Sequence, residues 1–228
     1  MAKFKDRYEL FKLEGLRNKP FALFYNPSMM TRFSSISGRE LSLKHLNIVL
    51  GHIDNNTKIN DIGCGRGFFG LELAKRKGCK VWACDGSERR TSIVRILSTI
   101  SDLDVTCEKL LLDEQNVHTL PEADVTLFLS VYHQIYINQG KKAADKILLV
   151  LWKKTKRTMI FAMADSREQD YPKYVEGMKD FGLEQDEIME NVTALLQSLP
   201  NSKVTIIGQC DYFNVTSPRY FFKVEKES

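Results

Sequence analysis

Residues 59–69 read INDIGCGRGFF, and this stretch decides the fold. It starts as a short apolar run, turns through glycines at positions 63, 65 and 67, and continues into a helix-like segment. Glycine lets the backbone turn sharply and lets a ligand approach the main chain, which a Cβ atom would block. The stretch therefore predicts a strand, a cofactor-binding loop and a helix, in that order.

The spacing of the glycines separates two classes of nucleotide-binding loop. The dinucleotide fingerprint G-x-G-x-x-G, started at Gly63, requires a glycine at position 68, where this chain has Phe68. The pattern present is D-x-G-x-G-x-G, running from Asp61 to Gly67. The sequence therefore does not carry the dinucleotide fingerprint.

A second acidic residue follows at a distance that suits a nucleotide site. The apolar run from Val81 to Cys84 ends in Asp85, which lies 22 positions after Gly63. Nucleotide-binding folds of this kind place a ribose-binding acid roughly 20 residues after the first glycine. We therefore expect the Asp85 carboxylate to accept hydrogen bonds from both hydroxyls of a ribose.

Short apolar runs alternate with longer amphipathic ones from residue 58 onward. The predicted strands are Lys58–Ile62, Lys80–Cys84, Val105–Glu108, Asp124–Ser130 and Thr158–Met163. The predicted helices are Phe68–Lys77, Glu88–Ile100 and Lys142–Lys153. Such alternation predicts a parallel sheet that helices cover on both faces.

The two ends of the chain complete the expected fold. A polar, helix-prone segment at Asp165–Leu199 precedes two strand candidates, Val204–Gln209 and Arg219–Val224, which are close enough to pair as an antiparallel hairpin. Residues 1–45 precede the first core strand and are predicted to be helical. The fold class is therefore α/β, with a doubly wound, mostly parallel seven-stranded sheet, a final antiparallel hairpin and an N-terminal helical cap.

The composition bounds the partners and the location. Apolar residues make up 43% of the 228 residues and charged residues 27%, so the chain can build a core of its own. The net charge of +4 permits nucleic acid but does not favour it, because basic and acidic residues are interspersed. The five cysteines form no CxxC pair, and the longest apolar run, Ile147–Trp152, is too short to cross a bilayer. We therefore expect a cytoplasmic protein without a membrane span.

Two of these motifs resemble those of one enzyme family. The D-x-G-x-G-x-G pattern resembles motif I of class I S-adenosylmethionine-dependent methyltransferases. The run from Asp124 to Gln134 resembles the fourth-strand motif of that family, an apolar strand followed by S-V-x-H-H, with Gln134 in place of the second histidine. A sheet that ends in an antiparallel hairpin is also typical of this family. The resemblance covers Lys58–Met163 and implies an enzyme that uses S-adenosyl-L-methionine.

The resemblance also implies which residues bind the cofactor. Asp61 stands where the cofactor's amino-acid part usually lies, and a carboxylate there suits its ammonium group. Asp113, in the loop after the third strand, is a candidate for the adenine amine; the alternative is an exposed turn acid. The residues expected to bind the cofactor are Asp61, Gly63, Cys64, Gly65, Gly67, Asp85, Gly86, Asp113 and Ser130.

Within the superfamily, the sequence is most similar to methyltransferase domains that modify sugars and polysaccharide ends. The segments that carry this narrower likeness are Gly67–Ala74, Leu129–Ile135, Ile207–Gly208 and Ser217–Arg219. The leading hypothesis is an O-methyltransferase that modifies a hydroxyl of a sugar or glycan. The alternatives are a methyltransferase for RNA or for another small molecule, and a binding module that has lost catalysis.

The predicted catalytic base is His133, just past the fourth strand, whose end faces the donor sulfur in the family. A histidine with an ordinary pKa is largely neutral at pH 7 and can take the proton of a hydroxyl acceptor. The alternative is that His133 only shapes the pocket, and Tyr132 and Asp165 are the reserve candidates. No metal is expected, because the spacing shows no cluster of metal-binding side chains.

The domain prediction places a helical cap or lid at residues 1–45 and one S-adenosylmethionine-binding methyltransferase domain at residues 46–228. Arg32 and Arg39 flank a segment that contains serine and glycine. Either arginine is a candidate to meet the cofactor's carboxylate if this segment moves as a gate. The alternative for both is an ordinary surface arginine.

Overall fold

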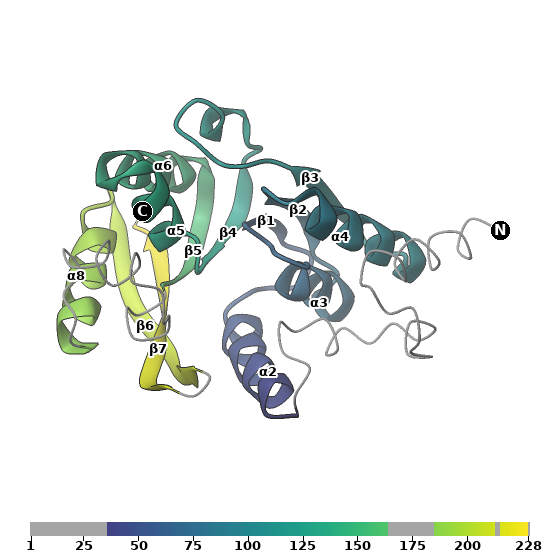
Figure 1. Ribbon diagram of the computed structural model, residues 1–228, viewed down its shortest axis with the longest axis horizontal. Helices are drawn as coiled ribbons and strands as arrows, with labels where there is room; N and C mark the ends of the chain where they lie inside the picture. Colours follow the sequence, from purple (N-terminus) through teal and green to yellow (C-terminus); the bar gives the residue numbers. More distant parts are fainter. Residues whose placement is uncertain (1–35, 164–184, 213–214, 228) are drawn as a thin grey trace.

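The computed structural model describes residues 36–163, 185–212 and 215–227 of the chain (Figure 1). Its centre is one seven-stranded sheet in the order β3-β2-β1-β4-β5-β7-β6. The strands are β1 (Lys58–Ile62), β2 (Lys80–Asp85), β3 (Val105–Lys109), β4 (Ala123–Leu129), β5 (Thr155–Ala162), β6 (Ser202–Tyr212) and β7 (Val215–Lys226). The helices are α2 (Ile36–Gly51), α3 (Phe68–Lys77), α4 (Glu88–Ser101), α5 (Tyr132–Gln139), α6 (Lys141–Lys154) and α8 (Gln185–Gln197), with a 3-10 turn η3 (Val117–Thr119).

The directions of the strands confirm the predicted fold class. Strands β1 to β5 pair in parallel, and β7 runs antiparallel to both of its neighbours, β5 and β6. The chain moves outward from β1 to β3 and then returns to add β4 on the other side of β1. The strand order therefore reverses between β1 and β4, and in open α/β sheets ligands bind beyond the carboxyl ends of the strands at such a point.

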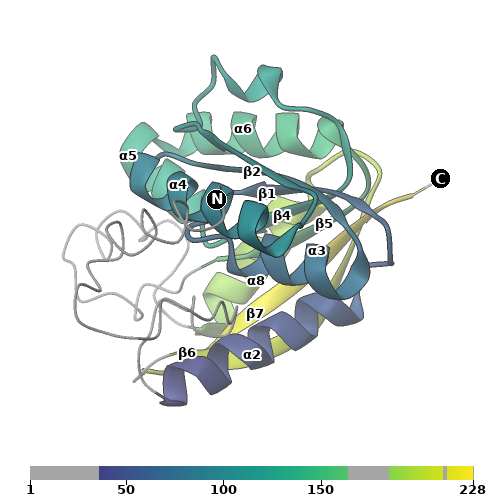
Figure 2. The ribbon, with the colours of Figure 1, turned by 90° about the vertical axis from the view of Figure 1, so that its right-hand side faces the viewer.

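Two apolar clusters hold helices on opposite faces of the sheet. Successive side chains of a strand point to opposite faces, so Leu127 and Phe128 of β4 belong to different clusters. One cluster joins the sheet to α5, α6 and α8, and the other joins it to α2, α3 and α4. Figure 2 shows α6 and α2 on opposite sides of the strands. The sheet is therefore covered on both faces, as the alternating pattern predicts.

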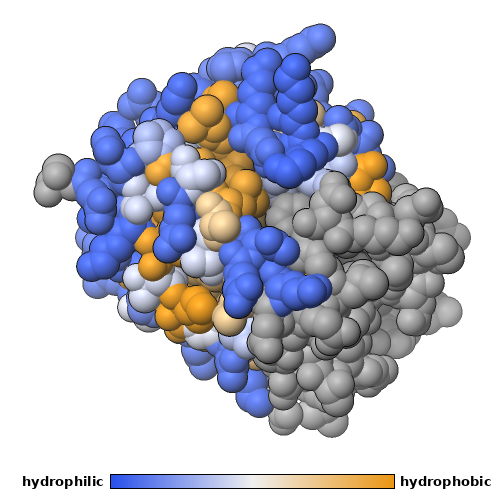
Figure 3. All heavy atoms as spheres, turned by 90° about the vertical axis from the view of Figure 1, so that its left-hand side faces the viewer, coloured by the Kyte–Doolittle hydropathy of each residue, from blue (hydrophilic) through white to orange (hydrophobic). Residues whose placement is uncertain are grey.

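Few large apolar side chains reach the surface. Among the side chains that the structure describes, Leu111 and Ile206 are the exposed large ones. On the face shown in Figure 3, hydrophobic atoms lie in small separate areas between hydrophilic ones. Within the described ranges, no helix combines the length and the apolar character that a bilayer crossing requires.

The observed elements differ from the predicted ones mainly after β4, where a further helix is present and β5, β6 and β7 are longer than predicted. A helix that was not predicted, α5, begins at Tyr132, so His133 lies in a helix. Strand β5 begins at Thr155, three residues before the predicted start, and Thr155 pairs with Ala123 of β4. The buried Thr155 hydroxyl also lies 2.7 Å from that of Thr126 in β4.

Helix α2 crosses the predicted boundary between the cap and the main domain. It runs from Ile36 to Gly51, and its second half buries Leu46 and Val49 completely. It also packs against β6, where a Cβ atom on Gly208 would lie 2.8 Å from Ile48. The described part of this helix therefore belongs to the core of the fold. Residues 1–35 lie outside the described residues, and so do Arg32 and the side chain of Arg39.

Candidate functional site

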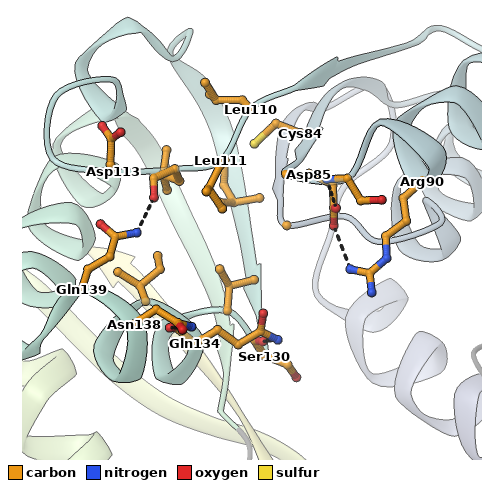
Figure 4. A pocket seen from close by; sticks show the side chains of 17 residues that line it. Cys84, Asp85, Arg90, Leu110, Leu111, Asp113, Ser130, Gln134, Asn138 and Gln139 are labelled. Carbon is orange, nitrogen blue, oxygen red and sulfur yellow. Dashed lines mark hydrogen bonds and ion pairs between the residues drawn. The ribbon is translucent and has the colours of Figure 1, made fainter.

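A cavity of about 790 Å³ opens at the carboxyl ends of β1, β2 and β4. Such a volume suits a ligand of nucleoside size. Figure 4 shows Asp85 and Arg90 on one wall, and Asp113 and Gln139 on the opposite wall. The polar side chains that line the cavity are Asp85, Ser87, Arg90, Asp113, Ser130, Gln134, Asn138 and Gln139. The cavity therefore lies at the position where the strand order predicts a ligand.

One residue of the glycine-rich loop between β1 and α3 lines the cavity, Gly63; the predicted cofactor-binding residues Cys64, Gly65 and Gly67 do not. Gly63 lines the cavity and has a φ of 65°, in the left-handed region. A Cβ atom on Gly63 would lie 2.4 Å from Cγ2 of Val131, which follows β4. The next residue, Cys64, donates its N–H to the Cys84 carbonyl at 2.9 Å, so the loop folds over the end of β2. This close packing explains why a glycine stands at position 63.

Gly63→Ala is expected to lower the free energy of unfolding by about 1–2 kcal/mol, the cost of a left-handed backbone for a residue with a Cβ atom. Chemical denaturation measures this change. Gly51→Ala is the matched control, because nothing lies within 4 Å of a Cβ atom there. Equal stability of the two variants would contradict the role given to Gly63.

Asp85 is fixed at the end of β2 by three donors. Its Oδ1 accepts the N–H of Ser87 at 2.9 Å, and its Oδ2 accepts the N–H of Gly65 at 3.1 Å. Arg90 approaches Oδ2 at 3.5 Å. The carboxylate therefore lines the cavity and also ties the glycine-rich loop to β2. Its predicted role toward a ribose is compatible with this position.

Asp61 lies deeper than the cavity. The residue is 3% exposed, is not among those that line the cavity, and accepts the N–H of Gly70 at 3.2 Å. The pKa of the Asp61 carboxyl is raised to about 7, chiefly by burial; the Gly70 N–H lowers it, and the nearby Asp85 adds a smaller rise. A cation placed beside Asp61 would favour its charged form. The predicted contact with an ammonium group is compatible with this electrostatic setting and stays a prediction.

The shifted pKa values predict how stability depends on pH. Because burial raises the pKa of Asp61 to about 7, its stabilising effect is complete below its unfolded pKa near 4 and is lost as the pH rises through 7. Burial, and then the charge of Arg219, lowers the pKa of His45 to about 4 and that of His133 to about 3. Their stabilising effect is complete above pH 6.5 and is lost as the pH falls through 4 and 3. Asp61 and the two histidines therefore act in opposite directions between pH 4 and 7.

Asp61→Asn is expected to make stability rise more steeply with pH between 4 and 7, because the opposing contribution is removed. The slope should increase by up to about 1.4 kcal/mol per pH unit, the value for one proton. Urea unfolding at a series of pH values measures it, with Asp104→Asn at an exposed position as the control. An unchanged slope would show that the pKa of Asp61 is not raised in the folded chain.

The surroundings of Asp113 are compatible with both predicted roles, a contact with the adenine amine and an acid in a turn. Its Oδ1 accepts the N–H groups of Gln115 and Asn116, both at 2.8 Å, as in a capped turn. Asp113 also lines the cavity, so its role toward adenine stays a prediction. Gly86 also lines the cavity, and a Cβ atom there would lie 3.0 Å from Leu111, which is 74% exposed.

Three amide side chains of the cavity were not predicted from the sequence. Gln134 occupies the position of the second histidine in the fourth-strand motif, lines the cavity and donates to the Ser130 carbonyl at 3.1 Å. Asn138 and Gln139 lie one turn further along α5, and Gln139 donates to the Leu112 carbonyl at 2.8 Å. The departure from the family motif at Gln134 is the signal that could have identified this wall.

The predicted base His133 and the reserve Tyr132 are not among the described residues that line the cavity. His133 lies on the buried side of α5 and is 1% exposed. Tyr132 is fully buried, donates its hydroxyl to Asp145, and has its pKa raised chiefly by burial. Asp165 lies outside the described residues. Within the described ranges, no three His, Cys, Asp or Glu side chains are grouped to hold a metal ion.

Comparisons with known proteins identify the fold. No protein-family model matches the chain, and no curated protein matches it significantly. The bifunctional kinase-methyltransferase WbdD superposes with a TM-score of 0.68 at 21% identity, covering 94% of this chain and 45% of WbdD. The chain thus spans less than half the length of WbdD.

Two smaller enzymes match over nearly their whole length. Magnesium protoporphyrin IX methyltransferase from Synechocystis PCC 6803, with bound SAM, gives a TM-score of 0.57 at 13% identity, covering 97% of both chains. Precorrin-6y C5,15-methyltransferase from Geobacter metallireducens GS-15 gives 0.55 at 12% identity, covering 86% of this chain and 93% of the other. The chain therefore has the fold of class I S-adenosylmethionine-dependent methyltransferases.

Proposed function

We propose that this chain is an enzyme, an S-adenosylmethionine-dependent O-methyltransferase that acts on a hydroxyl of a sugar or glycan. The observation that carries the proposal is the cavity at the strand ends, lined by Gly63 and by the Asp85 carboxylate, which the Gly65 N–H holds in place. The fold supports the first part of the proposal. The likeness to sugar-modifying domains in the sequence supports the acceptor class.

The walls of the cavity suit the three parts of S-adenosyl-L-methionine. Asp85 is placed to accept the ribose hydroxyls, and the apolar Leu110, Leu111 and Leu112 offer a surface for the adenine ring. Asp113 stands at the same wall for the adenine amine. Gly63, at the end of β1, lines the cavity where the amino-acid part would lie, with Asp61 behind it. Bound here, the cofactor would supply an electrophilic methyl group.

The protein has two tasks in such a transfer. It must hold the acceptor oxygen in line with the methyl group, and orientation alone supplies a large share of a rate enhancement. It must also remove the proton of the hydroxyl. We propose His133 for this step, which requires α5 to expose the buried imidazole to the bound acceptor. Its lowered pKa keeps the imidazole neutral at pH 7, which is the form that accepts a proton, but makes it a weak base.

The acceptor class is tested by methyl transfer from cofactor with a labelled methyl group to a panel of sugar nucleotides, glycans and RNA. We expect label on a sugar or glycan, and much less label with Asp85→Ala when the cofactor is below saturation. Label on RNA alone would support the alternative acceptor, and binding of the cofactor without transfer to any acceptor would indicate a binding module.

A further inference from the structure

Ser130, the first residue after β4, has a backbone conformation that is rare for serine. Its φ is 62°, in the left-handed region, and residues with a Cβ atom adopt this region only at an energetic cost. Such conformations persist where the surrounding contacts fix them, and they are frequent at functional sites. The structure must therefore contain contacts that hold Ser130 in place.

Three hydrogen bonds from three different elements hold this residue. The N–H of Ser130 donates to the Ala162 carbonyl of β5 at 2.7 Å, and its own carbonyl accepts from the Gln134 side chain at 3.1 Å. The third bond joins the hydroxyl to Arg219 of β7, whose Nη1 donates to Oγ at 2.6 Å. The main chain of Ser130 makes the first two bonds. The bond to Arg219 is the one of these three that requires the serine hydroxyl.

Arg219 lies 89 residues away in sequence and reaches Ser130 from the antiparallel hairpin. Its charge also contributes to the lowered pKa values of His45 in α2 and His133 in α5. The guanidinium is therefore close to α2, to the end of β4 and to the start of α5 at once. No motif in the sequence connects the hairpin with the end of β4.

The position of Ser130 is transmitted to Gly63, which lines the cavity, by the next residue. Val131 packs so tightly against Gly63 that a Cβ atom there would lie 2.4 Å from its Cγ2. Gly63, Ser130 and Val131 all line the cavity. A change in the backbone of Ser130 would therefore move Val131 relative to the glycine-rich loop.

We propose that Arg219 is a positioning residue of the cofactor site: by bonding to the Ser130 hydroxyl it holds the end of β4 in its left-handed conformation, and thereby sets Val131 against Gly63. Arg219 acts through Ser130 and Val131 and is not required to touch the cofactor. This inference rests on the proposed function, since it takes the cavity to bind S-adenosyl-L-methionine.

The test is a double-mutant cycle on cofactor affinity, measured by calorimetry with S-adenosylhomocysteine. Arg219→Met is expected to weaken binding by about tenfold, the scale of one hydrogen bond to a charged group. Arg219→Lys, which keeps a cationic donor, should restore most of the affinity. Ser130→Gly removes the hydroxyl but accepts a positive φ without strain, so adding Arg219→Met to it should change affinity by less than about twofold.

Arg157→Met is the matched control, because Arg157 pairs with Asp54 at the opposite end of the sheet. Two results would overturn the inference: full affinity in Arg219→Met, or an equal loss from Arg219→Met in the wild-type and Ser130→Gly backgrounds. If the wild-type chain does not bind the cofactor, the proposed function fails. The same double-mutant cycle, measured on the free energy of unfolding, then tests without ligand whether Arg219 holds Ser130 in place. Non-additive changes in that free energy support this role, and additive changes overturn it.

Discussion

His133→Gln is expected to lower the rate of methyl transfer at saturating cofactor by about a hundredfold or more, the usual scale of general-base catalysis. Glutamine is close to histidine in size but cannot take a proton, so the substitution removes the base and largely keeps the packing of α5. Affinity for the cofactor should stay within about twofold, because His133 does not line the cavity. His118→Gln, at an exposed position, is the control.

The low pKa of His133 also predicts how the rate of methyl transfer depends on pH. Because the pKa is about 3, the imidazole is neutral throughout the range from pH 5 to 8, and its protonation should not lower the rate in this range. A rate that falls with a midpoint near 6.5 in wild type, and not in the glutamine variant, would show that the acceptor complex restores an ordinary pKa. Near-normal turnover of His133→Gln would remove His133 from the mechanism and leave orientation as the source of the rate.

Asp85→Ala is expected to weaken binding of S-adenosyl-L-methionine by about 1.5–3 kcal/mol, or roughly ten- to 150-fold, because the ribose hydroxyls lose a charged acceptor. Part of the loss comes from the N–H groups of Gly65 and Ser87, which the carboxylate also accepts. Calorimetric titration measures the change. Asp104→Ala, at an exposed residue paired with Lys80, is the control.

Asp85→Asn separates the two roles of the carboxylate. The amide keeps the size and one acceptor oxygen, so the loop should stay folded while the charged contact to the ribose is lost. We expect an affinity between those of wild type and Asp85→Ala, with little change in the thermal unfolding midpoint. Unchanged affinity in both variants would refute the assignment of the ribose to Asp85.

The sequence predicts those parts of the fold that local patterns determine. Strand β1 and helix α3 were predicted with their observed bounds, because an apolar run, a glycine turn and a closing Gly78 lie next to one another in the chain. The position of Asp85 beside the glycine-rich loop was predictable because its distance from Gly63 follows from the length of one helix and one strand. These features need no knowledge of distant contacts.

Contacts between distant segments were not predictable in this way. The hydrogen bond between Arg219 and Ser130 joins residues that are 89 positions apart, and no periodicity in the sequence predicts it. Helix α5 was missed because it is only 8 residues long and follows a strong strand without a capping side chain. His133 is buried because it lies on the inner side of that helix. Its burial and its lowered pKa could therefore not be predicted from the sequence.

The most direct test of the central claim is a crystal structure of the chain with S-adenosylhomocysteine. We predict that the ligand lies in the cavity at the ends of β1, β2 and β4, with its ribose hydroxyls on Asp85, its adenine beside Leu111 and its amino-acid part over Gly63. Density for the ligand elsewhere on the chain, or a ribose that does not contact Asp85, would contradict this account.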